Sequence, residues 1–257
     1  DLNPLSGSNS VLLRQEMQEL LCALPEISAY GEGTMKIASE EKIIASTTLW
    51  PDGTAFSLPY FLNPSNKATV GFGSAIFAAI LYMMSNHFPL FESSTLPFSR
   101  IDEAAPFLPS TSWIYLSEYF LILSAFFMDD DLRKANRFVY GFLFLQFICN
   151  AIFLSFPTHY PRQAFPIPPG TDPASEFLMN VIRSADASGN CAPSLHVSCC
   201  YFGSFVFLEV KVAKRYLFPV YFLWATLVGI STLTTKQHYL MDVVLGFIFG
   251  ILAYWFF

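Results

Sequence analysis

Six apolar segments dominate most of this chain, and each is near the roughly 20 residues that a helix needs to cross a bilayer. They lie at about 68–88, 112–128, 137–156, 194–210, 216–232 and 239–257. Polar loops separate them, and the longest loop runs from 157 to 192. A loop of this length is more often functional than idle. The pattern predicts an all-α integral membrane protein with six transmembrane helices.

Residues 1–67 have a different pattern, because polar positions are mixed among the apolar ones. At 11–24 apolar residues recur at helical spacing up to Pro25, which predicts an amphipathic helix that packs on the spans or lies on the membrane surface. Glycines and prolines interrupt 28–66, where we expect loop and short elements. The chain therefore divides into an N-terminal extension, 1–67, and a six-helix membrane domain, 68–257.

Composition supports the membrane interpretation. Apolar residues make up 53% of the chain and charged residues only 13%, about half of what soluble domains carry. The net charge is −6, and the acids gather in the first 60 residues and at 129–131, so no basic surface is available for nucleic acid. The five cysteines contain no C-x-x-C pattern, and we interpret them as packing residues and not as a disulfide framework or a zinc site. These observations exclude nucleic-acid binding and a disulfide framework.

One polar patch opens the last apolar segment. His238 and Asp242 are four residues apart, so on a helix they share one face within hydrogen-bond reach. A carboxylate on one imidazole nitrogen orients the ring and makes the other nitrogen a better nucleophile. The alternative is a helix N-terminus with Ser231 as its cap and a polar first turn. We interpret the pair as half of a nucleophilic site.

A second patch, at 189–196, stands just before the fourth apolar segment and contains Ser194 and His196. Two imidazoles, each at the start of a hydrophobic span, can face one another at the same membrane depth. Arg162, in the long loop, belongs to the same side of the predicted domain. A guanidinium binds phosphate oxygens in a two-pronged way, and developing charge needs fixed cations. Together these residues predict a phosphoryl-transfer site.

The two patches resemble the motifs P-S-G-H and S-R-x-x-x-x-x-H-x-x-x-D of the type 2 phosphatidic acid phosphatase superfamily. Here they read P-S-L-H at 193–196, and S-T at 231–232 followed at the family's spacing by His238 and Asp242. The resemblance covers roughly 68–257. It implies a membrane enzyme that acts on lipid phosphates.

The resemblance also implies a role for each residue. His238 would attack phosphorus and form a phosphohistidine, Asp242 would orient it, and His196 would protonate the leaving oxygen and then activate the acceptor. The acid–base logic of a split displacement supports the same roles. Ser194 and the backbone N–H groups at the start of the fourth span would bind phosphate oxygens. We expect no metal and no other cofactor, because side chains supply the positive charge.

The chain departs from the family pattern where the family has cations. The family's first motif is K-x-x-x-x-x-x-R-P, and here Ser155 takes the Lys position and Gln163 the Pro position around Arg162. In the third motif Thr232 stands where the family has Arg. We expect Lys236 to replace the missing cation and bind phosphate; the alternative is a solvated loop lysine.

This loosened pattern, together with the segment at 102–109, resembles the inositolphosphorylceramide-synthase-like branch, which includes lipid phosphotransferases. We therefore expect a phospholipid donor whose phosphate passes to water or to a lipid hydroxyl, with a preference for transfer between lipids. One alternative is a plain phosphatase of lipid phosphates or polyprenyl diphosphates. The other is a non-catalytic transporter or scaffold, although a transporter should place ionisable residues near mid-span and here they gather at span ends.

Loop charge predicts the orientation in the membrane. Basic residues gather at 133–137 and 211–215, in the short connections opposite the two histidine patches. By the positive-inside rule these connections are cytoplasmic. The site would then face periplasm, lumen or exterior, with both termini in the cytoplasm.

Overall fold

The computed structural model describes residues 46–49, 55–128, 130–209 and 214–256. All of them belong to one compact unit, Ile44–Phe257. The amphipathic helix predicted at 11–24 lies outside the described residues, and the division at 67/68 stays a prediction. The first described element is an antiparallel pair of strands, β1 (Ser46–Leu49) and β2 (Ala55–Leu58).

Four helical stretches of the described chain are long and apolar enough to cross a membrane, which indicates an integral membrane protein. They are α2 (Lys67–His87), the continuous run of η1 (Pro109–Thr111), α4 (Ser112–Leu116) and α5 (Glu118–Met128), then α6 (Leu132–Ser155) and α9 (Leu217–Thr234). Two further apolar stretches are shorter: α8 (Leu195–Phe205) with η3 (Val206–Leu208), and α10 (Leu240–Phe256). Both fall inside predicted spans.

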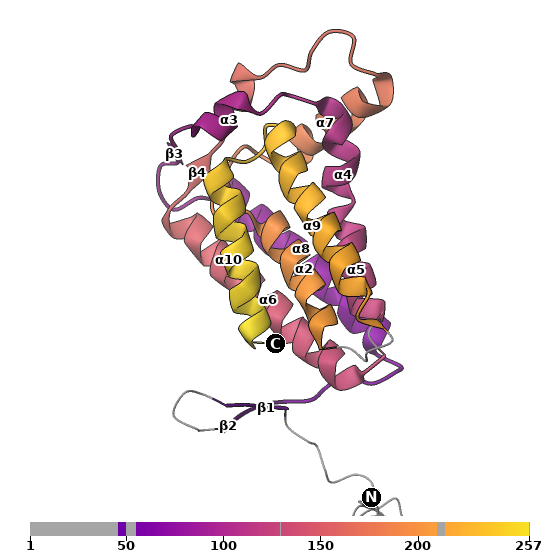
Figure 1. Cartoon of the computed structure of the whole chain (residues 1–257). Helices are drawn as coiled ribbons and strands as arrows, with labels where there is room; N and C mark the ends of the chain where they lie inside the picture. The colour runs from indigo at the N-terminus through magenta and orange to yellow at the C-terminus, as the bar shows by residue number, and fades with distance from the viewer. Residues whose placement is uncertain (1–45, 50–54, 129, 210–213, 257) are drawn as a thin grey trace, which may run out of the picture. The chain divides into compact units, whose positions relative to one another are not determined.

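Helix α8 lies among the other helices and packs against α5, α6, α9 and α10 (Figure 1). Its residues other than His196 are buried. The hydroxyls of Ser198 and Ser204 donate to backbone carbonyls of the preceding turn, so these polar groups are satisfied within the helix. The helix that carries the P-S-L-H motif is therefore enclosed by protein.

Two glycines one turn apart let α10 approach α8 closely. A Cβ atom at Gly246 would lie 2.7 Å from the carbonyl oxygen of Ser194, and one at Gly250 would lie 2.9 Å from that of Ser198. Small residues at such spacing allow helix backbones to meet, as is common between membrane helices. This contact brings the start of α10 beside the start of α8.

The segments between helices form a hydrogen-bonded layer at the end of the helices where α9 ends and α10 begins (Figure 1). Strand β3 (Ser94–Thr95) pairs in parallel with β4 (Thr158–His159). The N–H of Leu108 donates to the carbonyl of Thr234, the last residue of α9. The layer also contains α3 (Arg100–Ala104), η2 (Arg162–Ala164) and α7 (Pro173–Ala185).

Helix α7 corrects the expectation of an irregular loop at 157–192. Asp172 caps its N-terminus by accepting from the N–H of Ser175, and Pro173 takes the first helical position. Met179 and Ile182 are buried in a small cluster with Tyr115 of α4. The Asp-Pro start and the helical spacing of apolar residues are the sequence signals for this helix.

We predict that Gly246→Ala destabilises the protein by roughly 1–3 kcal/mol, because the added methyl group overlaps the backbone of α8. Thermal unfolding in detergent measures the effect. The control is Gly73→Ala in α2, where a Cβ would meet no atom within 4 Å. Equal melting temperatures for the two variants would contradict the proposed close packing.

Candidate active site

His238 lies in the turn between α9 and α10 and directs Nδ1 at two oxygen acceptors. Asp242 Oδ2 is 3.2 Å away and the carbonyl oxygen of Cys191 is 3.1 Å away. A ring nitrogen that faces only acceptors carries the proton, so the lone pair of the neutral ring lies on Nε2. The contacts therefore select the tautomer in which Nε2 is the nucleophilic or basic atom.

Asp242 is held at the first turn of α10, where its side chain is fully buried. Oδ2 also accepts from the N–H of Tyr239 at 2.9 Å. The backbone carbonyl of Asp242 accepts from the N–H of Ser194 at 3.0 Å. The same carboxylate thus orients His238 and caps the helix. Within the described structure, Oδ1 is buried and has no hydrogen-bond partner.

His196, the second residue of α8, faces His238 with 5.6 Å between ring centroids. Its Nε2 contacts the hydroxyl of Tyr115 and lies 3.5 Å from Oε1 of Glu118. Sequence analysis missed both partners. The available signal was Glu118 itself, the single charged residue of an apolar span, because a charge at that depth indicates a partner.

Arg162 is buried in the layer and forms a two-pronged contact with Asp186. Its two terminal nitrogens donate to the Asp186 carbonyl oxygen at 2.6 Å and to Oδ2 at 2.8 Å. Burial acts to lower the pKa of Arg162, but Asp186 reverses this and holds the pKa above its ordinary value. Asp186 also accepts from the hydroxyl of Tyr82, whose ring lies 6.3 Å from that of His196. Asp186 and Tyr82 therefore lie between Arg162 and His196 and connect the guanidinium to the histidine pair.

The remaining predicted phosphate ligands, Ser194 and Lys236, are both buried and form hydrogen bonds within the protein. Ser194 is fully buried as the N-cap of α8, with the N–H of Val197 donating to its hydroxyl. Lys236 is buried, and its ammonium donates to the carbonyls of Asp102 at 3.0 Å and Ala105 at 2.6 Å. Burial lowers the pKa of Lys236, against an opposing effect of Asp102. The role of Lys236 as a phosphate ligand stays a prediction.

Besides Leu195, which stands at the Gly position of P-S-G-H and is buried in α8, three positions lack the family's residues. Thr232 is fully buried in α9, and its hydroxyl donates to the carbonyl of Gly229 at 2.7 Å. Ser155 ends α6, and both Ser155 and Gln163 are exposed. None of the three carries a positive charge, so Arg162 and Lys236 are the cations nearest in sequence to the motifs.

Asp102 connects the layer to the start of α10. Its Oδ1 accepts from the N–H of Leu240 at 2.7 Å, and Oδ2 accepts from the N–H and hydroxyl of Ser99. The backbone carbonyl of Asp102 accepts a hydrogen bond from the ammonium group of Lys236. The buried acid therefore caps α3 and α10 together and fixes the turn that carries His238.

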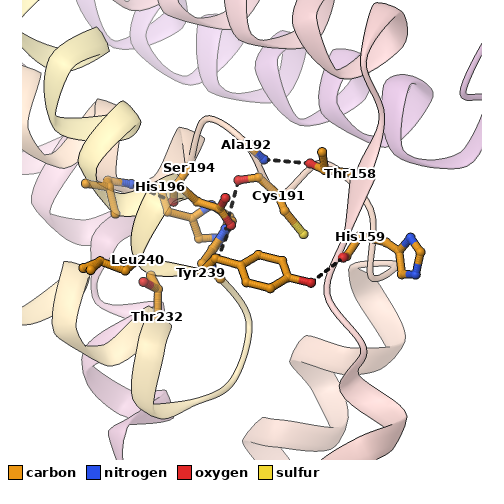
Figure 2. A network of polar contacts seen from close by, with 12 residues as sticks. Thr158, His159, Cys191, Ala192, Ser194, His196, Thr232, Tyr239 and Leu240 are labelled. Atoms are coloured by element: carbon orange, nitrogen blue, oxygen red, sulfur yellow. Dashed lines mark hydrogen bonds and ion pairs between the residues drawn. The ribbon is translucent and has the colours of Figure 1, made fainter. Parts of the chain in front are cut away.

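Figure 2 shows how the loop before α8 is attached at this point. The N–H of Ala192 donates to the hydroxyl of Thr158 at 3.0 Å, and Tyr239 reaches across to donate to the carbonyl of His159 at 3.1 Å. Cys191 is buried in a cluster with Tyr160 and Tyr239. Burial raises the pKa of Tyr239 to about 12, so its phenol is neutral at neutral pH and acts here as a donor.

A polar cavity of about 270 Å³ adjoins this network. Its polar lining comes from Ser85, Asn86, Ser93, His159, Ser188 and Asn190. Asn86 donates to Asp186 at 2.8 Å, which joins the cavity wall to the Arg162 pair. His159 lines this cavity, and its Nδ1 forms a hydrogen bond with the hydroxyl of Ser93 at 3.0 Å.

The described residues contain one group with metal-ligand chemistry at short range. Cys191, His238 and Asp242 each offer a donor atom, and the three atoms lie within 4.8 Å of one another. All three residues are buried.

A family model described as the PAP2 superfamily matches residues 98–256, more than half of the chain. The match includes both histidine patches and Arg162. No curated protein and no solved structure matches the chain.

We predict that Asp102→Ala lowers the free energy of unfolding by about 1.5–3 kcal/mol, because the N–H of Leu240 loses a charged acceptor in a buried position. Thermal unfolding in detergent provides the measurement. Glu103→Ala is the matched control, since Glu103 is exposed in the next position of the same helix. If Asp102→Ala were as stable as Glu103→Ala, Asp102 would not be needed to hold the turn that carries His238.

Proposed function

The chain belongs to the PAP2 superfamily, and we propose on this premise that it is a membrane enzyme that transfers a phosphoryl-containing headgroup from a phospholipid, through a phosphohistidine, to water or a lipid hydroxyl. Membership of the superfamily supports phosphatase-type activity. The observation that carries the finer proposal is the His238 ring, whose Nδ1 is engaged by Asp242 and Cys191 while its Nε2 carries the lone pair.

His238 Nε2 attacks phosphorus, and a nitrogen–phosphorus bond forms as the bond to the leaving oxygen breaks. His196 gives that oxygen a proton and then takes one from the incoming acceptor, whose oxygen displaces His238. Glu118, near Nε2 of His196, stabilises the protonated ring before the first step and again after the second, and the ring is neutral between them. Asp242 keeps the proton on Nδ1 and balances the charge that develops on His238.

Arg162 and Ser194 are proposed as phosphate ligands, with the N–H groups at the start of α8. Substrate phosphate competes with Asp186 for the guanidinium. The Nε of Arg162 is buried and has no partner in the described residues, so one donor is available without breaking the existing pair. Lys236 would have to leave two carbonyl oxygens to reach a phosphate, so we assign it first to holding α3 against the turn before α10.

The reduced cation set favours transfer from phosphodiesters. A monoester carries up to two negative charges and a diester carries one, and each uncompensated charge is costly in a buried site. Thr232 and Ser155 supply no charge where relatives have Arg and Lys. This supports placement in the inositolphosphorylceramide-synthase-like branch, and sphingolipid acceptors are the corresponding proposal.

We propose that all six apolar stretches span the membrane. Helices α8 and α10 are shorter than the other four, yet α8 is surrounded by protein and need not match the bilayer alone. Loop charge then orients the site toward periplasm, lumen or exterior and both termini toward the cytoplasm. The side chains at the site supply the charge stabilisation, so turnover should not require a metal.

The plain phosphatase remains the second candidate, because superfamily membership alone favours hydrolysis. A product assay decides between the two: purified protein is incubated with a phospholipid panel, with and without ceramide or diacylglycerol, and products are identified by mass. A new phospholipid supports transfer and free phosphate supports hydrolysis. A transporter would use mid-span charges as a path, whereas Glu118 here pairs with His196.

We predict that His238→Ala abolishes turnover and that His196→Ala lowers kcat by on the order of 10²–10⁴-fold, since one is the nucleophile and the other the acid. Asp242→Asn should leave a small residual activity. Alkaline quenching and mass spectrometry should detect phosphohistidine in wild type and not in His238→Ala. His87→Ala is the control, because His87 is exposed and, among the described residues, its ring forms a hydrogen bond with the carbonyl of Met83 in its own helix. Normal turnover by His238→Ala would refute the assignment.

We predict that Thr232→Arg shifts preference toward monoesters, lowering the ratio of diester to monoester kcat/KM by about tenfold, or roughly 1.4 kcal/mol. Thr232 is fully buried, so Thr232→Met serves as the control for added bulk without charge. The ratio is measured with lipids that share acyl chains. A wild-type enzyme that strongly prefers monoesters, with a ratio unchanged in Thr232→Arg, would favour the phosphatase instead.

A further inference from the structure

Cys191 lies where a soft metal ligand would meet the proposed nucleophile. Its donor atom and those of His238 and Asp242 lie within 4.8 Å of one another. The proposed reaction uses the backbone carbonyl of Cys191 and leaves its thiol without a task. The buried Oδ1 of Asp242 has no partner in the described residues, and an unpaired buried carboxylate oxygen is costly. A thiol and an unsatisfied carboxylate thus converge on one imidazole.

We propose that Cys191, His238 and Asp242 form an inhibitory site for Zn²⁺ or a similar thiophilic divalent cation. Thiolate, imidazole and carboxylate are the three ligand types that zinc takes in proteins, whereas Mg²⁺ and Ca²⁺ require oxygen donors. Tetrahedral zinc, at about 2.0–2.3 Å from each donor, holds donor atoms roughly 3.3–3.8 Å apart. The three donor atoms, now within 4.8 Å of one another, would have to approach by about 1 Å to bind the ion.

The charge balance suits a buried position. Binding removes the proton from the Cys191 thiol and releases it to solvent, so the cation of charge +2 meets one thiolate and one carboxylate. The complex of ion and protein ligands is then neutral, which lowers the cost of burial.

Metal binding would inactivate His238 by placing the proton of its neutral ring on Nε2, the atom that attacks phosphorus in the proposed reaction. The ring faces Asp242 with Nδ1, so this nitrogen must give its lone pair to the metal. The proton of the neutral ring then moves from Nδ1 to Nε2 through solvent, and Nε2 has no lone pair left for phosphorus. This consequence rests on the proposed function, whereas metal binding itself does not.

Cobalt provides a test of binding that does not depend on turnover. Full-length protein in detergent is treated with EDTA, freed of chelator and titrated with Co²⁺. We expect one equivalent to bind, with the visible absorption of tetrahedral cobalt and a thiolate-to-metal charge-transfer band. Zn²⁺ should remove both signals by displacement. Cys191→Ser should lose the charge-transfer band and raise the apparent Kd by at least the roughly 10- to 100-fold that loss of a supporting partner costs.

Cys199→Ser is the matched control, since Cys199 is also a buried free thiol but belongs to α8 outside the cluster. It should keep both bands. Absence of the cobalt signals from wild type, or their retention in Cys191→Ser, would overturn the site. If Cys191→Ser failed to fold, the cobalt titration of wild type would still test the site, because absence of both cobalt signals there overturns the proposal.

The inhibitory role is tested by phosphatase or transferase turnover against free Zn²⁺. Wild type should lose at least about tenfold in kcat at saturating zinc and recover with EDTA. Cys191→Ser, compared with its own zinc-free rate, should resist zinc. Cobalt bound through Cys191 without any effect of zinc on turnover would refute inhibition while leaving the metal site standing, and inactivity of EDTA-treated wild type would count against the proposed function.

Discussion

The close approach of α8 and α10 is the constraint on which the site depends. The missing side chains at Gly246 and Gly250 let the two backbones meet at the level of Ser194 and Ser198. The carbonyl of Asp242 accepts from the N–H of Ser194 at the same contact. Because His196 is the second residue of α8 and His238 lies just before α10, this packing sets the 5.6 Å separation of the two rings. Any displacement of the helices would separate them.

Three acids, of which Asp242 and Glu118 are buried and Asp186 is half-buried, hold the basic groups of the site in place. Asp242 accepts from His238, and Glu118 lies near His196. Asp186 accepts two hydrogen bonds from Arg162. In an apolar surrounding an unpaired charge is expensive, so each base with a fixed partner is stabilised in one position before any substrate arrives. If Arg162 binds phosphate as proposed, the phosphate meets a guanidinium whose two terminal nitrogens already contact Asp186.

The layer of inter-helix segments holds the candidate site at one end of the helices. Asp102 accepts from the start of α10 and its carbonyl receives Lys236, so α3 is tied to the turn before His238. The polar cavity beside Asn86 opens from the same layer. Loops usually provide function on a rigid scaffold. Here the loops are themselves rigidified, because their backbone groups are paired with one another and with buried side chains.

The sequence by itself determined the features that depend on local spacing. Apolar length placed the helices, and the four-residue offset of His238 and Asp242 predicted their contact, because both follow from the geometry of one helix. Tertiary structure alone decided the long-range partners. Asp102 meets Leu240 across 138 residues, Tyr115 meets His196 across 81, and Lys236 reaches carbonyls of α3 where phosphate binding was expected. Such contacts arise from how helices pack, which no local pattern encodes, and they decide which cations stay available for a phosphate.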